Sequence, residues 1–259
     1  MSEHVALPIE NPRGLRIGWI PEILFRPGTG FNRVANQTGS VWLTPLLILT
    51  LMALLQVIVA GPLKKEAAIR GQVELPPEFQ YYSPEQQAQF QQAMAATQSP
   101  VFIYVFPAFT SVAGVWVGWL LVGGLVHLAL TLLGGRSETG ITMNLVAWAS
   151  LPIAVRAGVR IVYMLMTDQL ISAPGLAGFA PAGESAVSMY LAALLALIDL
   201  YVIWHVVLLV KGIEATDSLV VGKILAGVLV VIVFALFLQA LLSYLITRLS
   251  NLTIIRPFF

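Results

Sequence analysis

Four residues that can carry a charge near neutral pH lie within the apolar stretches 141–166 and 188–210: Arg156, Arg160, Asp199 and His205. A charge near the centre of a bilayer costs about 2.5–3.5 kcal/mol on insertion scales, so such a residue needs a partner or a task. An internal ion pair would fix the register of a helix bundle, whereas a row of ionisable groups could pass protons or ions. The residue types therefore predict either a structural pair or a relay within a membrane.

The arginines and the aspartate are predicted to lie at the same depth. Arg156 lies ten residues before the end of the predicted span 141–166. Asp199 lies eleven residues after the start of the predicted span 188–210. At 1.5 Å per residue, both lie about 15 Å from one membrane surface, and Arg160 is one helical turn from Arg156. We interpret this layer as an internal ion pair, with a proton or ion relay and an oligomer or partner interface as alternatives.

His127 and His205 are predicted to form a second polar layer, nearer the opposite surface. His127 lies six residues before the end of its predicted span, and His205 lies five residues before the end of its own. Pro152 lies one turn before Arg156, and its missing N–H is expected to kink the helix and free a carbonyl group. Structural contact and relay are the alternatives for the histidines as well.

Recognised catalytic and metal-binding motifs are absent from the sequence. There is no cysteine, and none of the three histidines has an acidic residue at i+1 or a second histidine at i+4. The H-E-x-x-H, G-x-S-x-G and Walker motifs are also missing. We therefore expect no enzymatic activity, no bound metal and no cofactor.

The composition indicates a membrane protein. Of 259 residues, 58% are hydrophobic and 10% are charged, compared with about 25% charged residues in soluble domains. The net charge of +1 provides no basic surface for nucleic acid, so the lipid bilayer is the expected partner and nucleic acid is not.

Five apolar stretches are long enough to form helices that cross a membrane. Twenty helical residues span about 30 Å, which is the thickness of the hydrocarbon layer. The predicted fold is an all-α integral membrane protein with a bundle of five transmembrane helices. Its spans are expected at about 41–60, 108–133, 141–166, 188–210 and 224–246 within residues 41–246.

Other segments precede, join and follow these spans. Residues 61–100 form an insert in which Ser83 and Gln86 have the spacing of a capping box, so we expect a short extracytoplasmic helix there. Residues 247–259 are predicted to be a C-terminal tail.

The N-terminal segment 1–40 mixes apolar, aromatic and basic residues, which is typical of a segment at the membrane interface. An anchor at the membrane surface is the favoured interpretation, and a docking surface for a cytosolic partner is the alternative. The expected contact residues are Trp19, Phe25, Arg26, Phe31 and Arg33.

Small residues recur at a spacing of four within three of the predicted spans. Gly114 and Gly118 form one such pair, Ala154 and Gly158 form another, and Ala192 and Ala196 form a third. Small residues at this spacing allow two helices to approach closely. Packing between helices of the same chain is the favoured interpretation, and a homo-oligomer is the alternative.

The distribution of Lys and Arg predicts the orientation of the chain. Seven of these residues lie on the side of the N-terminus and five lie on the other side, and the loop 168–187 contains none. By the positive-inside rule, we expect a multi-pass protein of the plasma (inner) membrane with a cytoplasmic N-terminus and an external C-terminus.

Short motifs distributed along the chain resemble those of a known family. They are IPEILFRP at 20–27, FNRV at 31–34, LLGG at 132–135, WASLP at 148–152, LIDLYVIW at 197–204 and LLVKGI at 208–213. Together they resemble the Yip (Ypt-interacting protein) domain family in its bacterial form, over residues 17–237.

This resemblance implies a five-span membrane protein without catalytic residues. Eukaryotic relatives act in membrane traffic with Rab-type GTPases, and bacterial relatives sometimes accompany ABC-type exporters. The Gln-rich insert and the short N-terminal region depart from the eukaryotic pattern, which puts a GTPase partner in doubt. The expected function is a membrane scaffold or accessory subunit that binds a protein partner, and the alternative is a small ion, proton or solute transporter.

Overall fold

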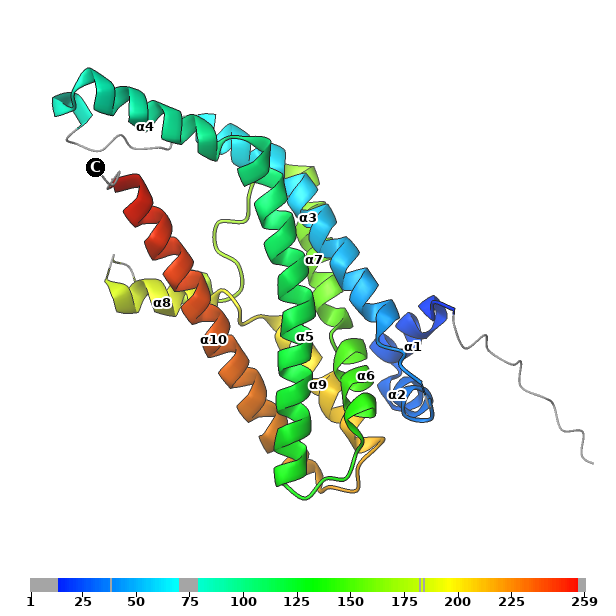
Figure 1. Cartoon of the computed structure of the whole chain (residues 1–259). Coiled ribbons are helices and arrows are strands. Elements are labelled where there is room, and N and C mark those ends of the chain that lie inside the picture. The colour runs from blue at the N-terminus through cyan, green and yellow to red at the C-terminus, as the bar shows by residue number, and fades with distance from the viewer. Residues whose placement is uncertain (1–13, 38, 70–78, 182, 184, 256–259) are drawn as a thin grey trace, which may run out of the picture.

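A computed structural model describes residues 14–37, 39–69, 79–181, 183 and 185–255. Parts of three predicted segments lie outside the described residues: 1–13 of the N-terminal segment, 70–78 of the insert and 256–259 of the C-terminal tail. Helices and turns account for all regular structure in the described residues (Figure 1). The elements are η1 Ile17–Trp19, α1 Ile20–Phe25, α2 Pro27–Ala35, α3 Leu43–Ile69, η2 Phe79–Tyr81, α4 Pro84–Thr97, the π-helical η3 Val101–Val105, α5 Phe106–Leu132, α6 Thr139–Ala149, α7 Leu151–Thr167, η4 Ala177–Phe179, α8 Ala186–Leu195, α9 Leu200–Glu214 and α10 Val221–Ile255.

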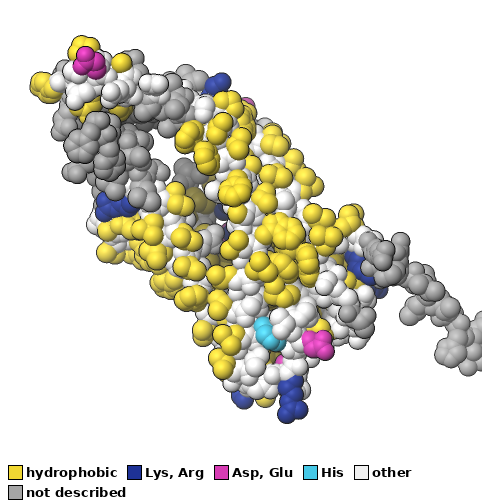
Figure 2. Space-filling model, in the orientation of Figure 1, with side chains coloured by type: hydrophobic (Ala, Val, Ile, Leu, Met, Phe, Trp, Pro, Cys, Tyr) yellow, Lys and Arg dark blue, Asp and Glu magenta, His cyan; other side chains and the backbone are white. Residues whose placement is uncertain are grey.

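The described helices confirm the class of helical membrane protein. Four stretches are long and apolar enough to cross a bilayer, and the bent pair of α8 and α9 adds a fifth if the pair is taken as one span. In the face that Figure 2 shows, hydrophobic side chains cover most of the middle and charged side chains lie mainly toward the ends. The four stretches are Leu43–Ala67, Val101–Leu132, Thr139–Thr167 and Val221–Arg248.

The long helices pack side by side, with α3 against α5 and α7, and α10 against α5, α8 and α9. Figure 1 shows α4 extending from one end of the molecule, and the C-terminal part of α10 approaches the same end. The turns after α5 and after α9 lie at the opposite end. At the start of α4, the Ser83 N–H donates to Gln86 Oε1 and the Gln86 N–H donates to Ser83 Oγ, at 2.9 and 3.2 Å, so the predicted capping box is confirmed.

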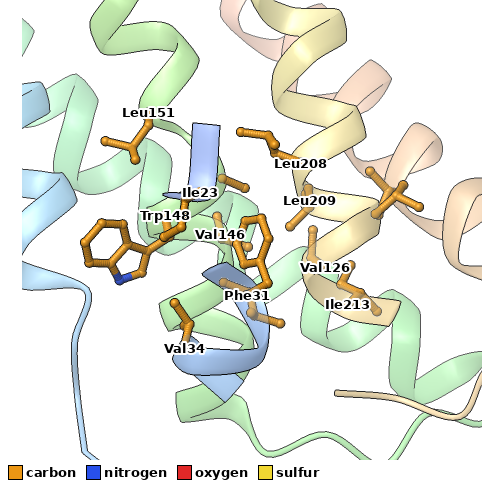
Figure 3. Packing of buried hydrophobic residues seen from close by; sticks show 14 of the residues in the cluster. Ile23, Phe31, Val34, Val126, Val146, Trp148, Leu151, Leu208, Leu209 and Ile213 are labelled. Carbon is orange, nitrogen blue, oxygen red and sulfur yellow. The ribbon is translucent and has the colours of Figure 1, made fainter. Parts of the chain in front are cut away.

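The N-terminal helices are part of the hydrophobic core. Trp19, Ile23, Phe31 and Val34 are buried, and Figure 3 shows Phe31 and Val34 of α2 beside residues of α6 and α9. The ring of Trp19 packs against that of Trp148, with centroids 5.6 Å apart. The prediction that Trp19 and Phe31 contact the membrane interface is therefore wrong, because their apolar rings face the bundle.

Two polar groups of α6 hold the chain between α2 and α3. Asn144 Oδ1 accepts from the Val41 N–H at 3.0 Å, and Asn144 Nδ2 donates to the Gly39 carbonyl at 3.1 Å. Trp148 Nε1 donates to the Val41 carbonyl, also at 3.1 Å. The two bonds to Val41 satisfy its buried backbone groups where the N-terminal segment enters the bundle, and sequence reasoning assigned no such role to Asn144 or Trp148.

Three glycines that were predicted to pack within the chain face open space. A Cβ atom added at Gly114, Gly118 or Gly158 would meet no atom within 4 Å beyond its own helix and chain neighbours. By contrast, a Cβ atom at Gly212 would lie 3.0 Å from the ring of Phe31, so close packing uses that glycine. The internal-packing prediction is wrong for the first three, whereas Ala154 is buried as expected.

Candidate functional site

The predicted fourth span is interrupted near its middle. Helix α8 ends at Leu195, α9 begins at Leu200, and the two helices are bent by 58°. Figure 1 shows α8 lying across α10, whereas α9 runs along the bundle. An uninterrupted helix over 188–210 was assumed in estimating the depth of Asp199, and that assumption is wrong.

Asp199 forms the N-cap of α9. Its backbone is extended, with φ −149° and ψ 178°, and Oδ1 accepts from the N–H groups of Tyr201 and Val202 at 3.0 and 3.1 Å. An aspartate that accepts from the second and third helical N–H groups stabilises the start of a helix by about 0.5–2 kcal/mol. Since no Gly or Pro lies between Leu195 and Leu200, an Asp within an apolar run was the one available signal for this break.

The loop after α7 folds back onto the end of α8. The Leu176 N–H donates to the carbonyl groups of Leu195 and Ile198, at 2.9 and 3.1 Å. Gly175 has φ +59°, in the left-handed region, and a Cβ atom there would lie within 3 Å of three carbonyl groups of the break. This glycine therefore lets the loop satisfy backbone oxygens that the interrupted helix leaves without partners.

Both predicted arginines face Asp199 from α7. Arg156 Nη1 donates to Asp199 Oδ2 at 3.1 Å, which confirms the predicted contact. Arg160 Nη2 lies 4.0 Å from the same oxygen, within ion-pair range but beyond a hydrogen bond. The side chains are 19% exposed for Arg156, 25% for Arg160 and 14% for Asp199. The three residues are therefore mostly buried, but each keeps some exposed surface.

The histidines do not form a common layer. His205 is buried, and its Nδ1 lies 2.8 Å from the Ala149 carbonyl oxygen. His127 instead lies 3.0 Å from Thr139 Oγ1 and 3.5 Å from Thr142 Oγ1, at the start of α6. No His127–His205 contact occurs among the described residues, and the predicted pairing is wrong because each ring has a partner on α6.

Pro152 explains why the Ala149 carbonyl is available. It lies at the second position of α7. The adjacent Ile153 N–H would donate to the Ala149 carbonyl in a continuous helix, but here it donates to the Ser150 carbonyl at 2.9 Å. Helix α6 consequently ends at Ala149, and the free carbonyl accepts from the His205 ring. The predicted break at Pro152 is thus confirmed, and the carbonyl that accepts from His205 is that of Ala149, because the Ile153 N–H donates to Ser150.

The cluster of Arg156, Arg160 and Asp199 is an internal ion pair between two helices, with one surplus positive charge. Two guanidinium groups face one carboxylate, which uses one oxygen for the helix cap and the other for Arg156. Within the described part of the chain, no buried side-chain nitrogen or oxygen lacks a hydrogen bond, and no group of three His, Asp or Glu residues could hold a metal ion. This arrangement can fix the position of α9, and it offers no nucleophile paired with a base.

The remaining residues of the predicted interfacial contact lie on the outer side of α1 and α2. Phe25 is 76% exposed and Arg26 is exposed. Arg33 Nη1 forms an ion pair with Glu22 at 3.0 Å. Their interfacial role stays a prediction, and their exposure is compatible with it.

Comparison with known proteins gives one match. A sequence model of the Yip1 domain matches residues 22–244. No curated protein and no solved structure matches the chain.

Proposed function

This chain belongs to the Yip1 domain family, and from that premise we propose that it is a non-enzymatic membrane scaffold or accessory subunit that binds a protein partner. The Arg156–Asp199 pair supports a scaffold because it joins α7 to the start of α9. Both carboxylate oxygens are bonded within the protein, one to the backbone of α9 and the other to Arg156. The partner is a membrane complex, and an ABC-type exporter is the class that the family resemblance suggests.

The observation that carries partner binding is the outward face of α5. Gly114 and Gly118 lie one turn apart with open space beside them, and Val117 next to them is 60% exposed. In a bilayer, small residues at this spacing allow another helix to approach closely, and dispersion contacts then stabilise the pair. A helix of the partner, or of a second copy of this chain, fits this face.

Substitution of both glycines tests the proposal. We expect Gly114→Leu with Gly118→Leu to abolish recovery of the crosslinked partner from mild detergent, because two leucines hold the helices apart. Gly124→Leu is the matched control, since Gly124 also has open space beside it but lies on another side of α5. Equal recovery of the same partner by the double variant and the control would refute this interface, and the mass of the crosslinked product distinguishes a homo-oligomer from a heteromeric complex.

We further propose that the protein lies in the plasma (inner) membrane with a cytoplasmic N-terminus. The chain has no cysteine, so single cysteines can report which side is accessible. Glu138→Cys and Ser172→Cys suit this test, because both residues are exposed, whereas the Ser137 hydroxyl is bonded to Asp217. An impermeant maleimide should label the variant at 172 from outside and leave the variant at 138 unlabelled; the reverse pattern would invert the orientation.

A small transporter is the second candidate function, favoured by the break between α8 and α9. Broken helices beside charged residues mark substrate and ion sites in many transporters. The scaffold proposal predicts no flux of protons or ions in liposomes containing the protein alone. Flux that Asp199→Asn removes would favour the transporter.

A further inference from the structure

We propose that the surface around α1 binds an anionic phospholipid, with an acyl chain in an apolar groove and the phosphate group beside Arg26. Two grooves border α1, one containing Ile20 and Leu24 and the other containing Pro21 and Phe25. Ile20 and Pro21 are consecutive residues, as are Leu24 and Phe25, so the two grooves lie on neighbouring faces of this six-residue helix and one lipid molecule can contact both. The site uses neither the outward face of α5 nor the ion pair, and it is independent of the proposed partner.

The first groove suits an acyl chain. It has a volume of about 510 Å³, and all of its lining residues, from α1, α3 and α7, are apolar or glycine. Leu151 at its base is buried, and Gly158 beside it leaves open space. A hydrocarbon chain fills such a groove without loss of hydrogen bonds, since the lining side chains present no polar atom.

The second groove suits a phosphate group. It has a volume of about 620 Å³ and includes Glu22, Arg26, Thr29 and Arg33 among its lining residues. Glu22 is neutralised by Arg33 at 3.0 Å, whereas the Arg26 guanidinium has no ion pair or hydrogen bond among the described residues. The N–H and the hydroxyl of Thr29 both donate to the Arg26 carbonyl, at 3.1 and 3.0 Å, so the charge of the Arg26 guanidinium is what attracts the anion. The groove therefore has a surplus positive charge.

These two features together select a lipid as the occupant. The second groove contains two arginines and one glutamate, so this side of α1 attracts anionic headgroups. The exposed Phe25 next to Arg26 is an apolar residue of the kind that interfacial helices bury at the boundary between headgroups and acyl chains. A transmembrane helix of a partner could fill the apolar groove, but it would bring no anion to Arg26, whereas a phospholipid supplies both parts.

Native mass spectrometry of the full chain tests the site. The protein, purified in a neutral detergent, is titrated with an equimolar mixture of phosphatidylglycerol and phosphatidylcholine that carry the same acyl chains. We expect preferential retention of phosphatidylglycerol, and we expect Arg26→Gln to lower the ratio of the two bound lipids about fivefold through loss of one basic contact. Gly158→Leu should reduce retention of both lipids because its side chain fills the groove.

Matched variants give the controls. Arg136→Gln removes another exposed arginine, and Gly124→Leu adds a leucine at another open glycine, so both should leave lipid retention unchanged. If Gly158→Leu fails to fold, Val159→Phe at the exposed rim of the groove replaces it.

Several outcomes would overturn the lipid site. One is an unchanged lipid ratio in Arg26→Gln, and another is an equal fall in Arg136→Gln, which would indicate general attraction to anionic lipid. Displacement of the lipid by inorganic phosphate would indicate a site for free phosphate. Loss of a protein partner, but not of lipid, in Gly158→Leu would assign the groove to a helix.

Discussion

At the scale of single residues, Asp199 has a different task for each of its carboxylate oxygens. Oδ1 caps α9, and Oδ2 accepts from Arg156. A charge-swapped pair cannot reproduce this arrangement, because an arginine at position 199 has no acceptor for the N–H groups of Tyr201 and Val202. A pair of neutral amides removes the charges and keeps an oxygen that can cap the helix.

We therefore expect Asp199→Asn and Arg156→Gln to be coupled. Each single variant should lower the free energy of unfolding by about 1–3 kcal/mol, because Arg156→Gln removes the closer of the two arginines from Asp199 and Asp199→Asn leaves both arginines without their carboxylate. The double variant should lose less than the sum of the two, by about 0.5–3 kcal/mol. Unfolding in detergent micelles measures all four proteins, and strictly additive losses would mean that the 3.1 Å contact contributes no coupling.

His127 and His205 should be uncoupled, because each has its own partner on α6. His205→Leu leaves the buried Ala149 carbonyl without a donor and is expected to cost about 1–3 kcal/mol of stability. His127→Leu is expected to cost less, because that ring is only partly buried. In the double variant, the losses of unfolding free energy should add to within about 0.5 kcal/mol. A larger coupling energy would indicate that the two histidines interact, as the sequence predicted.

The residue types predicted the ion pair between Arg156 and Asp199. The spacing also predicted that the two residues meet, but on the wrong assumption of a continuous helix. Arg156 and Asp199 do meet, yet the estimate of depth relied on an uninterrupted helix that the structure lacks. The burial of Trp19 and Phe31 could not be predicted from their surroundings in the sequence, because an apolar residue next to charges fits an interface or a core equally well. Contacts with residues distant in the sequence, such as Trp148 and Gly212, place these two rings in the core.

At the scale of elements, α8, α9 and the loop after α7 form one unit. The loop supplies the Leu176 N–H to the end of α8, and Asp199 begins α9. Hydrophobic periodicity could not reveal this break, since residues on both sides of it are apolar and remain helical. Pro152, by contrast, marks the break between α6 and α7 directly, because a proline cannot donate the backbone hydrogen bond.

Gly175 is expected to be essential for this unit. Gly175→Ala places a Cβ atom within 3 Å of three carbonyl groups and in a left-handed conformation, so the loop must move away from the break. We expect a loss of about 1–3 kcal/mol and faster proteolysis within 168–187. Gly178→Ala is the control, because a Cβ atom there meets nothing within 4 Å, and equal behaviour of the two variants would contradict the role assigned to Gly175.

At the scale of the whole molecule, one carboxylate joins two turns at the end opposite α4. Asp217 Oδ2 accepts from the Arg136 N–H at 3.1 Å and from the Ser137 hydroxyl at 2.9 Å. It thereby links the turn between α5 and α6 to the turn between α9 and α10. The helical class and the general course of the chain were predictable from composition, whereas a link between turns so far apart was not.

Asp217→Ala should loosen this end without unfolding the bundle. We expect faster amide hydrogen exchange in residues 133–138, because the Arg136 N–H loses its acceptor, and unchanged exchange in the middle of α5. Glu138→Gln is the control, since it alters a neighbouring exposed carboxylate. Unchanged exchange in Asp217→Ala would show that the link does not hold the two turns.

The contact between Phe31 and Gly212 also constrains the order of biosynthesis. Helix α2 leaves the ribosome before α6 and α9, but the surface that covers Phe31 belongs to these two later helices. The nascent chain therefore inserts its first helices while its N-terminal aromatic residues are still uncovered. The packing around α2 is therefore completed only after α9 has been synthesised, and a chain truncated before α9 has no complete site for α2.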